Sequence, residues 1–239
     1  MRHKARAIIM KRVAYGEADW IVTFFDRERG RMSGMAKSAR SSIKRFGGAL
    51  EPGTQVEMSC ASRHSSGLVR IEEARVLESP NGAVKSLERI AGMARALDLA
   101  MAFLQEGQPA PEKFDLLAER LAVLSSRDPR VSEGVLFELE WLKLSGFGPR
   151  VESCSLCEAE AVGAVAGVWS FDMDRGGLLC PACSMGAGLK VRLASGALGA
   201  LQKAAAGKDE GDGFGAAGDI LARYVDHVVG RPLKVWRVA

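Results

Sequence analysis

Four of the five cysteines fall into two closely spaced pairs. Cys154 and Cys157 form one C-x2-C pair, Cys180 and Cys183 form the other, and 22 residues separate the pairs. Two such pairs supply four thiolates, the donor set of a tetrahedral Zn²⁺ site with Zn–S bonds of ~2.3 Å. Because four cysteines complete the coordination, no position remains for an activated water. We therefore expect one structural zinc ion and no catalytic metal.

A second group of residues with evident chemistry is a basic segment near the N-terminus, residues 27–46. Serines, glycines and alanines separate its charges, so the segment should present its cations outward. Spaced cations on such a loop suit a phosphate backbone, where Lys and Arg neutralise charge and release counterions. An ordinary solvated charged face is the alternative. The cations are Arg27, Arg29, Arg31, Lys37, Arg40, Lys44 and Arg45, against the single acid Glu28.

The charge of the chain is unevenly distributed. Residues 1–50 contain twelve Lys or Arg and four Asp or Glu, a surplus of eight, within a net charge of only +4. The remaining residues contain 21 bases and 25 acids, a deficit of four. A basic N-terminal module on a mildly acidic body indicates a polyanionic partner for the N-terminal part.

Several classes of protein are disfavoured by what the sequence lacks. No apolar run approaches the ~20 residues of a membrane span, and the first residues contain no signal-peptide core, so we expect a cytoplasmic protein. In a reducing compartment the cysteines argue for metal ligation over disulfides, with Cys60 as a small buried residue. His3, His64 and His227 lie far apart, and no H-x-E deaminase motif, P-loop, dinucleotide fingerprint or Ser/His/Asp order occurs. We therefore do not expect an enzyme.

The sequence around the basic segment has the pattern of β-strands. Five short strands within about 80 residues predict a small barrel or sandwich. An oligonucleotide-binding (OB) barrel fits the count and the charge, and a Tudor- or SH3-like barrel fits the strands nearly as well. The strands are expected at residues 5–13, 18–25, 30–37, 54–61 and 67–77.

Adjacent aromatic residues in the second expected strand raise the question of base stacking. Phe24 and Phe25 point to opposite faces of the strand, so one should belong to the core. The other, with Trp20 or Phe46, could offer a stacking surface for a base, worth ~1–3 kcal/mol per base. A core position is the more common role for an aromatic residue in a small barrel.

After residue 80 the apolar spacing changes to that of helices. An amphipathic stripe predicts a helix from Val84 to Leu104, and Pro111 opens a second helix. Asp128 should cap a third helix whose inward face begins at Val131. Between the cysteine pairs, residues 162–168 and 169–171 are strand-like and a turn is expected at 174–177, as in a zinc ribbon. Further helices are expected at 196–206, capped by Ser195, and at 214–229.

Short motifs along nearly the whole chain resemble the RecO family of bacterial recombination mediators. Each fragment is weak alone, and their order and spacing carry the resemblance. Members commonly have glycine where this chain has Ser38, and some members have lost the metal cysteines that this chain keeps. The matching fragments are Gly16–Asp19, Ile21–Val22, Gly30, Ala36–Arg40, Leu50–Pro52, Phe137–Leu139, Leu144–Pro149, Cys154, Tyr224–His227 and Leu233–Lys234.

The resemblance implies an N-terminal OB-fold, a helical body and a zinc module in the C-terminal half. It also implies binding to single- and double-stranded DNA and annealing of complementary strands. The implied partners are RecR and the single-stranded-DNA-binding protein, in a complex that helps to load RecA. By charge, strand–loop placement and the family motif, the expected DNA contacts are Arg6, Arg12, Lys37, Arg40, Lys44 and Arg45.

We therefore predict an α+β multidomain protein with an OB-fold β-barrel, an α-helical body and an inserted zinc-ribbon-like module that has four cysteine ligands. The expected domains are residues 1–80 (DNA-binding OB-fold), 81–149 (helical), 150–190 (zinc module) and 191–239 (helices that pack on the helical domain). The rival hypotheses are an RNA-binding adaptor with an OB-like barrel and a ribbon, and a structural interaction protein with an incidental basic face.

Overall fold

The computed structural model describes residues 2–61, 67–161, 168–186, 188–194 and 196–233. The chain divides into two compact units, the first ending at Asp128 and the second beginning at Pro129. The finer division into four domains stays a prediction. Most of the strand expected at 162–168 falls outside the described residues, as do the cap expected at Ser195, His64 and Lys234.

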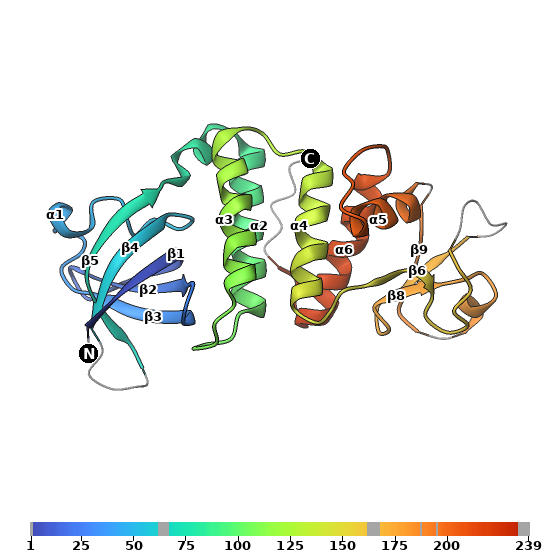
Figure 1. The fold of residues 1–239 in the computed structure, drawn as a ribbon, viewed down its shortest axis with the longest axis horizontal. Helices are drawn as coiled ribbons and strands as arrows, with labels where there is room; N and C mark the ends of the chain where they lie inside the picture. Colours follow the sequence, from blue (N-terminus) through green and yellow to red (C-terminus); the bar gives the residue numbers. More distant parts are fainter. Residues whose placement is uncertain (1, 62–66, 162–167, 187, 195, 234–239) are drawn as a thin grey trace. The chain divides into compact units, whose positions relative to one another are not determined.

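The first unit begins with five strands that close into a barrel in the order β1-β2-β3-β5-β4 (Figure 1). Most neighbours pair antiparallel, and β3 pairs with β5 in parallel through Gly34–Val69, Met35–Arg70 and Ala36–Ile71. A closed five-stranded barrel is the OB architecture that we expected. The strands are β1 (Arg2–Tyr15), β2 (Asp19–Asp26), β3 (Gly30–Ala36), β4 (Gln55–Ala61) and β5 (Val69–Glu78).

Strand β1 is longer than the nine residues expected because two partners share it. Its first half pairs with β4 from Arg2 to Ile8, and its second half pairs with β2 from Ala7 to Tyr15. The register shifts between Ile9 and Lys11, where the strand bends from one partner to the other. This bend lets one strand close the barrel.

The barrel is filled by alternating side chains from its strands, including Ile9, Phe24 and Met58, all almost fully buried. Phe25 points to the opposite face and is also fully buried, with its ring 5.4 Å from that of Phe114 in an edge-on arrangement. Burying one such ring contributes ~1.5–3 kcal/mol. Both phenylalanines are therefore core residues, and the suggestion that one of them is free to stack on a base is wrong.

Helices follow the barrel within the same unit. The 3-10 helix η1 (Pro80–Lys85) leads to α2 (Leu87–Phe103), and α3 (Pro111–Ser126) begins at a proline as expected. The predicted inward stripe of α2 is wrong at its start, because Val84, Leu87 and Ile90 are exposed. The α-helix begins only at Leu87, with Ser86 as its N-cap. The expected stripe starts within the preceding 3-10 helix, whose side chains repeat with a different period. The buried residues of α2 are Ala96, Leu97, Leu99 and Ala100.

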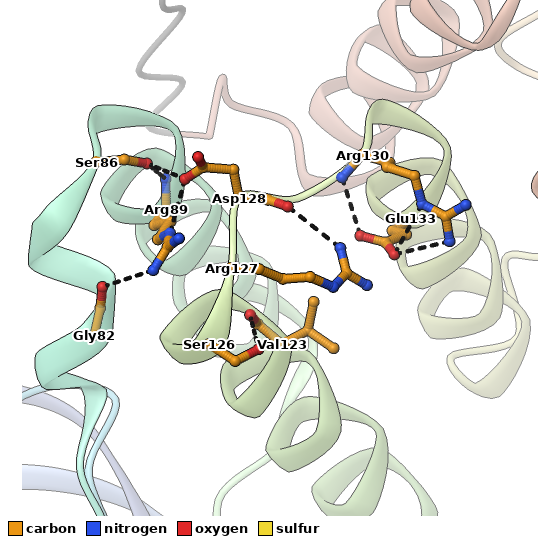
Figure 2. Close-up of polar contacts among 9 residues, drawn as sticks. All are labelled: Gly82, Ser86, Arg89, Val123, Ser126, Arg127, Asp128, Arg130 and Glu133. Atoms are coloured by element: carbon orange, nitrogen blue, oxygen red, sulfur yellow. Dashed lines mark hydrogen bonds and ion pairs between the residues drawn. The ribbon is translucent and has the colours of Figure 1, made fainter.

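A polar cluster fastens the end of α3 to the beginning of α2 (Figure 2). The carboxylate of Asp128 accepts hydrogen bonds from the Ser86 hydroxyl and the Arg89 guanidinium, both at 2.7 Å, and Arg89 also donates to the carbonyl of Gly82. The prediction that Asp128 caps the third helix is therefore wrong. Arg130 is its N-cap residue, and the backbone N–H of Arg130 donates to Glu133 at 3.0 Å.

The second unit combines three helices with a small sheet of order β6-β8-β7-β9. Val131, expected to face inward, is exposed at the first position of its helix. The last helix has the predicted bounds because left-handed glycines, Gly213 and Gly230, flank both of its ends. The elements are α4 (Val131–Leu144), β6 (Arg150–Cys154), β7 (Ser170–Asp172), β8 (Gly177–Leu179), η2 (Cys183–Met185), β9 (Lys190–Arg192), α5 (Ala197–Ala205) and α6 (Phe214–Val229).

Within the described residues, none of the helices has the length and apolar character required to cross a membrane.

Candidate functional site

The four paired cysteines converge on one point of the second unit. Their Sγ atoms all lie within 4.8 Å of one another. The first pair begins at the end of β6 and the second directly follows β8, and these two strands pair in parallel through Cys154 and Leu178. The sheet thus places side by side two pairs that are distant in the sequence.

The spacing of the sulfur atoms fits a tetrahedral metal ion. A tetrahedron with metal–sulfur bonds of ~2.3 Å has sulfur–sulfur edges of ~3.8 Å. The Sγ atoms of Cys157 and Cys180 are 3.7 Å apart. Together, Cys154, Cys157, Cys180 and Cys183 could hold a single metal ion with all four positions filled by protein.

Backbone amides favour the ionised form of Cys154. Burial opposes ionisation, but hydrogen bonds from the backbone at Cys157, Cys180 and Leu156 outweigh it and lower the pKa of Cys154 to about 6. The N–H of Cys180 donates to the Cys154 sulfur at 3.4 Å. Since a metal binds thiolate and not thiol, these amides prepare the sulfur for a cation.

The sheet that carries the cysteines is anchored on helix α6. The ring of Phe171, in β7, lies 5.3 Å from that of Tyr224, and the Tyr224 hydroxyl donates to the carbonyl of Phe147 at 3.2 Å. In addition, the Nε2 atom of His227 lies 3.1 Å from a carboxylate oxygen of Asp174. The metal candidate is therefore part of the packing of its unit.

The first half of the basic segment is used in contacts inside the first unit. Arg27 forms a two-pronged bond to Asp115 of α3, at 3.0 and 2.7 Å. Arg29 pairs with the buried carboxylate of Asp26, and Arg31 donates to a carbonyl of α2. These three cations are half-buried and already have partners within the unit, so the segment as a whole does not present free cations as we expected.

The second half of the segment forms a loop beside the start of β2, and short contacts fix its shape. Asp19 accepts a hydrogen bond from the backbone N–H of Ser38 at 2.7 Å. Arg45 donates to the carbonyl of Lys37 at 2.8 Å, and Arg40 donates to the carbonyl of Glu17 at 3.0 Å. Lys37, Arg40 and Lys44 remain exposed and Arg45 is half-buried.

Arg12, from the neighbouring strand β1, joins this loop through Trp20. Its guanidinium carbon lies 4.6 Å from the centre of the Trp20 ring, and that of Arg40 lies 5.8 Å from it. A salt bridge of 2.7 Å to Glu51 holds Arg12 in place. We call the cluster of Arg12, Lys37, Arg40, Lys44 and Arg45 the basic loop site.

Arg6 does not share the immediate surroundings of the basic loop site. Its guanidinium carbon lies 6.0 Å from the centre of the Phe114 ring, on the side of the barrel that α3 covers. The structure thus places five of the six predicted DNA contacts in the basic loop site and the sixth beside a helix. The role of Glu51 was not predictable from the sequence, because its partner Arg12 lies 39 positions earlier, in β1.

Comparison with known proteins decides the family. The model described as "Recombination protein O N terminal" matches residues 1–80, and "Recombination protein O C terminal" matches residues 84–237. The chain belongs to the RecO family. A RecO-family protein of Anaeromyxobacter dehalogenans (strain 2CP-C), named DNA repair protein RecO, is 35% identical over 99% of this chain and 95% of its own length. The protein of that name from Myxococcus xanthus is 32% identical over 98% of this chain and 95% of its own length.

The RecO family assignment spans both units, so it applies equally to the barrel and to the cysteine cluster. A third relative of the same name, from Syntrophotalea carbinolica, is 32% identical over 95% of this chain and 90% of its own length. The resemblance that we drew from short motifs is thereby confirmed.

Proposed function

We propose that this RecO-family protein acts in DNA repair and homologous recombination. It binds single- and double-stranded DNA, anneals complementary strands and, together with RecR, helps to load RecA onto DNA coated with single-stranded-DNA-binding protein. Family membership over both units supports the role in repair. The single observation that supports DNA binding is the convergence of five cations on the basic loop site.

Annealing requires no bond to be made or broken, so we propose that the protein is not an enzyme. Two complementary strands repel each other through their phosphates. A protein that neutralises both backbones lowers this repulsion and raises the local concentration of the strands. Base pairing then supplies the specificity, and the protein needs to contact only the backbone.

We further propose that the ion held by the four cysteines is one structural Zn²⁺. An all-thiolate donor set selects a soft or borderline metal over Mg²⁺ or Ca²⁺. Its place in the mechanism is to hold the second unit in shape while the basic loop site contacts DNA. The protein would work in the cytoplasm, at the nucleoid.

The salt dependence of DNA binding tests the proposal. Each phosphate contact contributes ~0.7–0.9 to the slope of log affinity against log salt concentration. Loss of four contacts should therefore reduce the slope by roughly 3. The variant carries Ala at Lys37, Arg40, Lys44 and Arg45, and its binding to a labelled oligonucleotide is measured by anisotropy over a series of salt concentrations.

A matched control removes four exposed cations from other parts of the chain, so the change in net charge is the same. The control should keep nearly the full slope. Equal slopes for the wild type and the first variant would overturn the assignment of the basic loop site. Stronger annealing of matched RNA than of DNA would favour the adaptor hypothesis instead. The control residues are Lys85, Lys203, Lys208 and Arg223.

A further inference from the structure

A small pocket lies within the basic loop site. Its volume is about 160 Å³. Pockets for drug-sized ligands measure ~300–1,000 Å³, so this one has room for a single flat group. Residues of β1, β2, the loop after β3, the four-residue helix α1 (Ile43–Phe46) and the chain that follows it form the pocket. The lining includes Arg12, Trp20, Arg40, Ile43, Phe46 and Glu51.

The pocket has an apolar part whose outer residue is unusually open. Phe46 is buried and continuous with the barrel core, whereas Ile43, one turn away, is 84% exposed. Lys44 and Arg45 directly follow Ile43. Ile43 thus offers an exposed apolar surface directly beside cations and at the edge of the pocket. Such a combination suits a ligand that is both flat and apolar and is linked to negative charge.

The guanidinium of Arg12 is already held in a stacking geometry. It lies over the indole of Trp20 at 4.6 Å, and Glu51 fixes it at 2.7 Å. Bases that are not paired stack on aromatic rings and on the planes of arginine side chains. Arg12 and Trp20 therefore form a stacked pair of planar groups that an unpaired base can extend, beside exposed cations for its phosphates.

We propose that this pocket receives one unpaired nucleobase of a bound strand, with the neighbouring phosphates on Lys37, Arg40 and Lys44. The proposal rests on the proposed function and deepens it, because it adds a base contact to a site described above as binding only the backbone. The base packs against Ile43 and stacks on the planar groups at Arg12 and Trp20. A base within a duplex is covered on both faces by its neighbours, so the pocket selects single strands.

The pocket overlaps only one edge of the surface that OB-folds generally use, through Arg12 of β1 and Trp20 of β2. Oligonucleotides commonly lie across the face of strands β2 and β3, between the β1–β2 and β4–β5 loops. Here the pocket lies beside the connection from β3 to β4, where α1 and Glu51 contribute to its lining.

The test compares two probes that carry the same phosphates. One is an oligothymidylate, and the other is an abasic oligonucleotide of equal length with tetrahydrofuran at every sugar. Wild-type protein should bind the probe with bases roughly 5- to 150-fold more tightly, the range expected for one stacked base. The same probe should quench tryptophan fluorescence, and a Trp20→Phe variant should lose this quenching.

Ile43→Ala provides the decisive variant, because its side chain is exposed and its loss should not unfold the barrel. The Ile43→Ala variant should bind the oligothymidylate less tightly than the wild type does. Its affinity for the abasic oligonucleotide should be unchanged. Val131→Ala, at another exposed apolar position, is the matched control and should behave as wild type.

Each other outcome is informative. Equal affinity for the two probes overturns the base pocket and leaves the proposed function intact. If neither probe binds at low salt, both proposals fail. If the two probes bind equally and an acidic peptide quenches Trp20 instead, the pocket serves a protein partner and the base assignment is wrong.

Discussion

Ser38 adopts the left-handed backbone conformation, with a φ of 53°, in the middle of the basic loop site. A side chain in this region costs on the order of 1–3 kcal/mol, and the contact from Asp19 to the Ser38 N–H compensates for it. The residue that RecO-family members commonly have here, glycine, adopts this conformation without strain.

Ser38→Gly should therefore stabilise the folded protein by ~0.5–1 kcal/mol, after allowing for the greater freedom of glycine in the unfolded chain. The measurement is the free energy of unfolding in urea. Gly16→Ala is the matched reverse change, since Gly16 also has positive φ, of 58°, and nothing lies within 4 Å of the added carbon. It should destabilise the protein through the backbone alone. A loss of stability in Ser38→Gly would show that the loop is not strained.

At the scale of elements, the carboxylate of Asp128 joins the start of α2 to the end of α3. Hydrogen bonds from Ser86 and then from Arg89 lower its pKa below the usual 3.8. Because its folded-state pKa is depressed, the group stabilises the folded protein above pH 3.8. The stabilisation by the Asp128 carboxylate is lost as the pH falls through its folded-state pKa.

Asp128→Ala should lower the melting temperature at neutral pH, and the difference from wild type should shrink as the pH falls below 3.8. Thermal unfolding followed by circular dichroism over a pH series is the measurement. Added salt should also reduce the difference, because Asp128 is largely exposed. Asp212→Ala, in the exposed loop before α6, is the control. If the difference in melting temperature between wild type and Asp128→Ala does not depend on pH, the charge of the carboxylate contributes nothing to stability.

Some of the helices and strands could be predicted from the sequence, and others could not. The bounds of α6 were predictable because glycines mark both ends, and the strands were predictable from their alternation. The start of α2 was not, because a 3-10 segment interrupts the apolar period. The pairing of Arg27 with Asp115 could not be predicted, because the two residues are 88 positions apart in the sequence. The pocket was equally hidden, since β1, β2 and α1 each contribute only part of it.

At the scale of the whole molecule, the metal candidate and the basic loop site belong to different units. Loss of the metal should therefore damage one unit and leave the other able to bind DNA. Structural zinc contributes ~10–16 kcal/mol of apparent binding free energy in small metal-dependent domains.

Cys154→Ser should thus abolish stoichiometric zinc binding, measured by atomic absorption, and lower the melting temperature. The slope of DNA affinity against salt should stay close to wild type. Cys60→Ala is the matched control, because Cys60 is as deeply buried as Cys154 but lies in the barrel core. It should keep its zinc. Full zinc content in Cys154→Ser would exclude the four-cysteine site.

The parallel pairing of β3 with β5 has a consequence for the newly made protein. As the chain leaves the ribosome, β1, β2 and β3 appear first, but the outer edge of β3 stays unpaired until residues 69–71 follow. An open strand edge invites pairing with other nascent chains. Uninterrupted translation from Ala36 to Glu78 should therefore protect this protein from aggregation during its own synthesis.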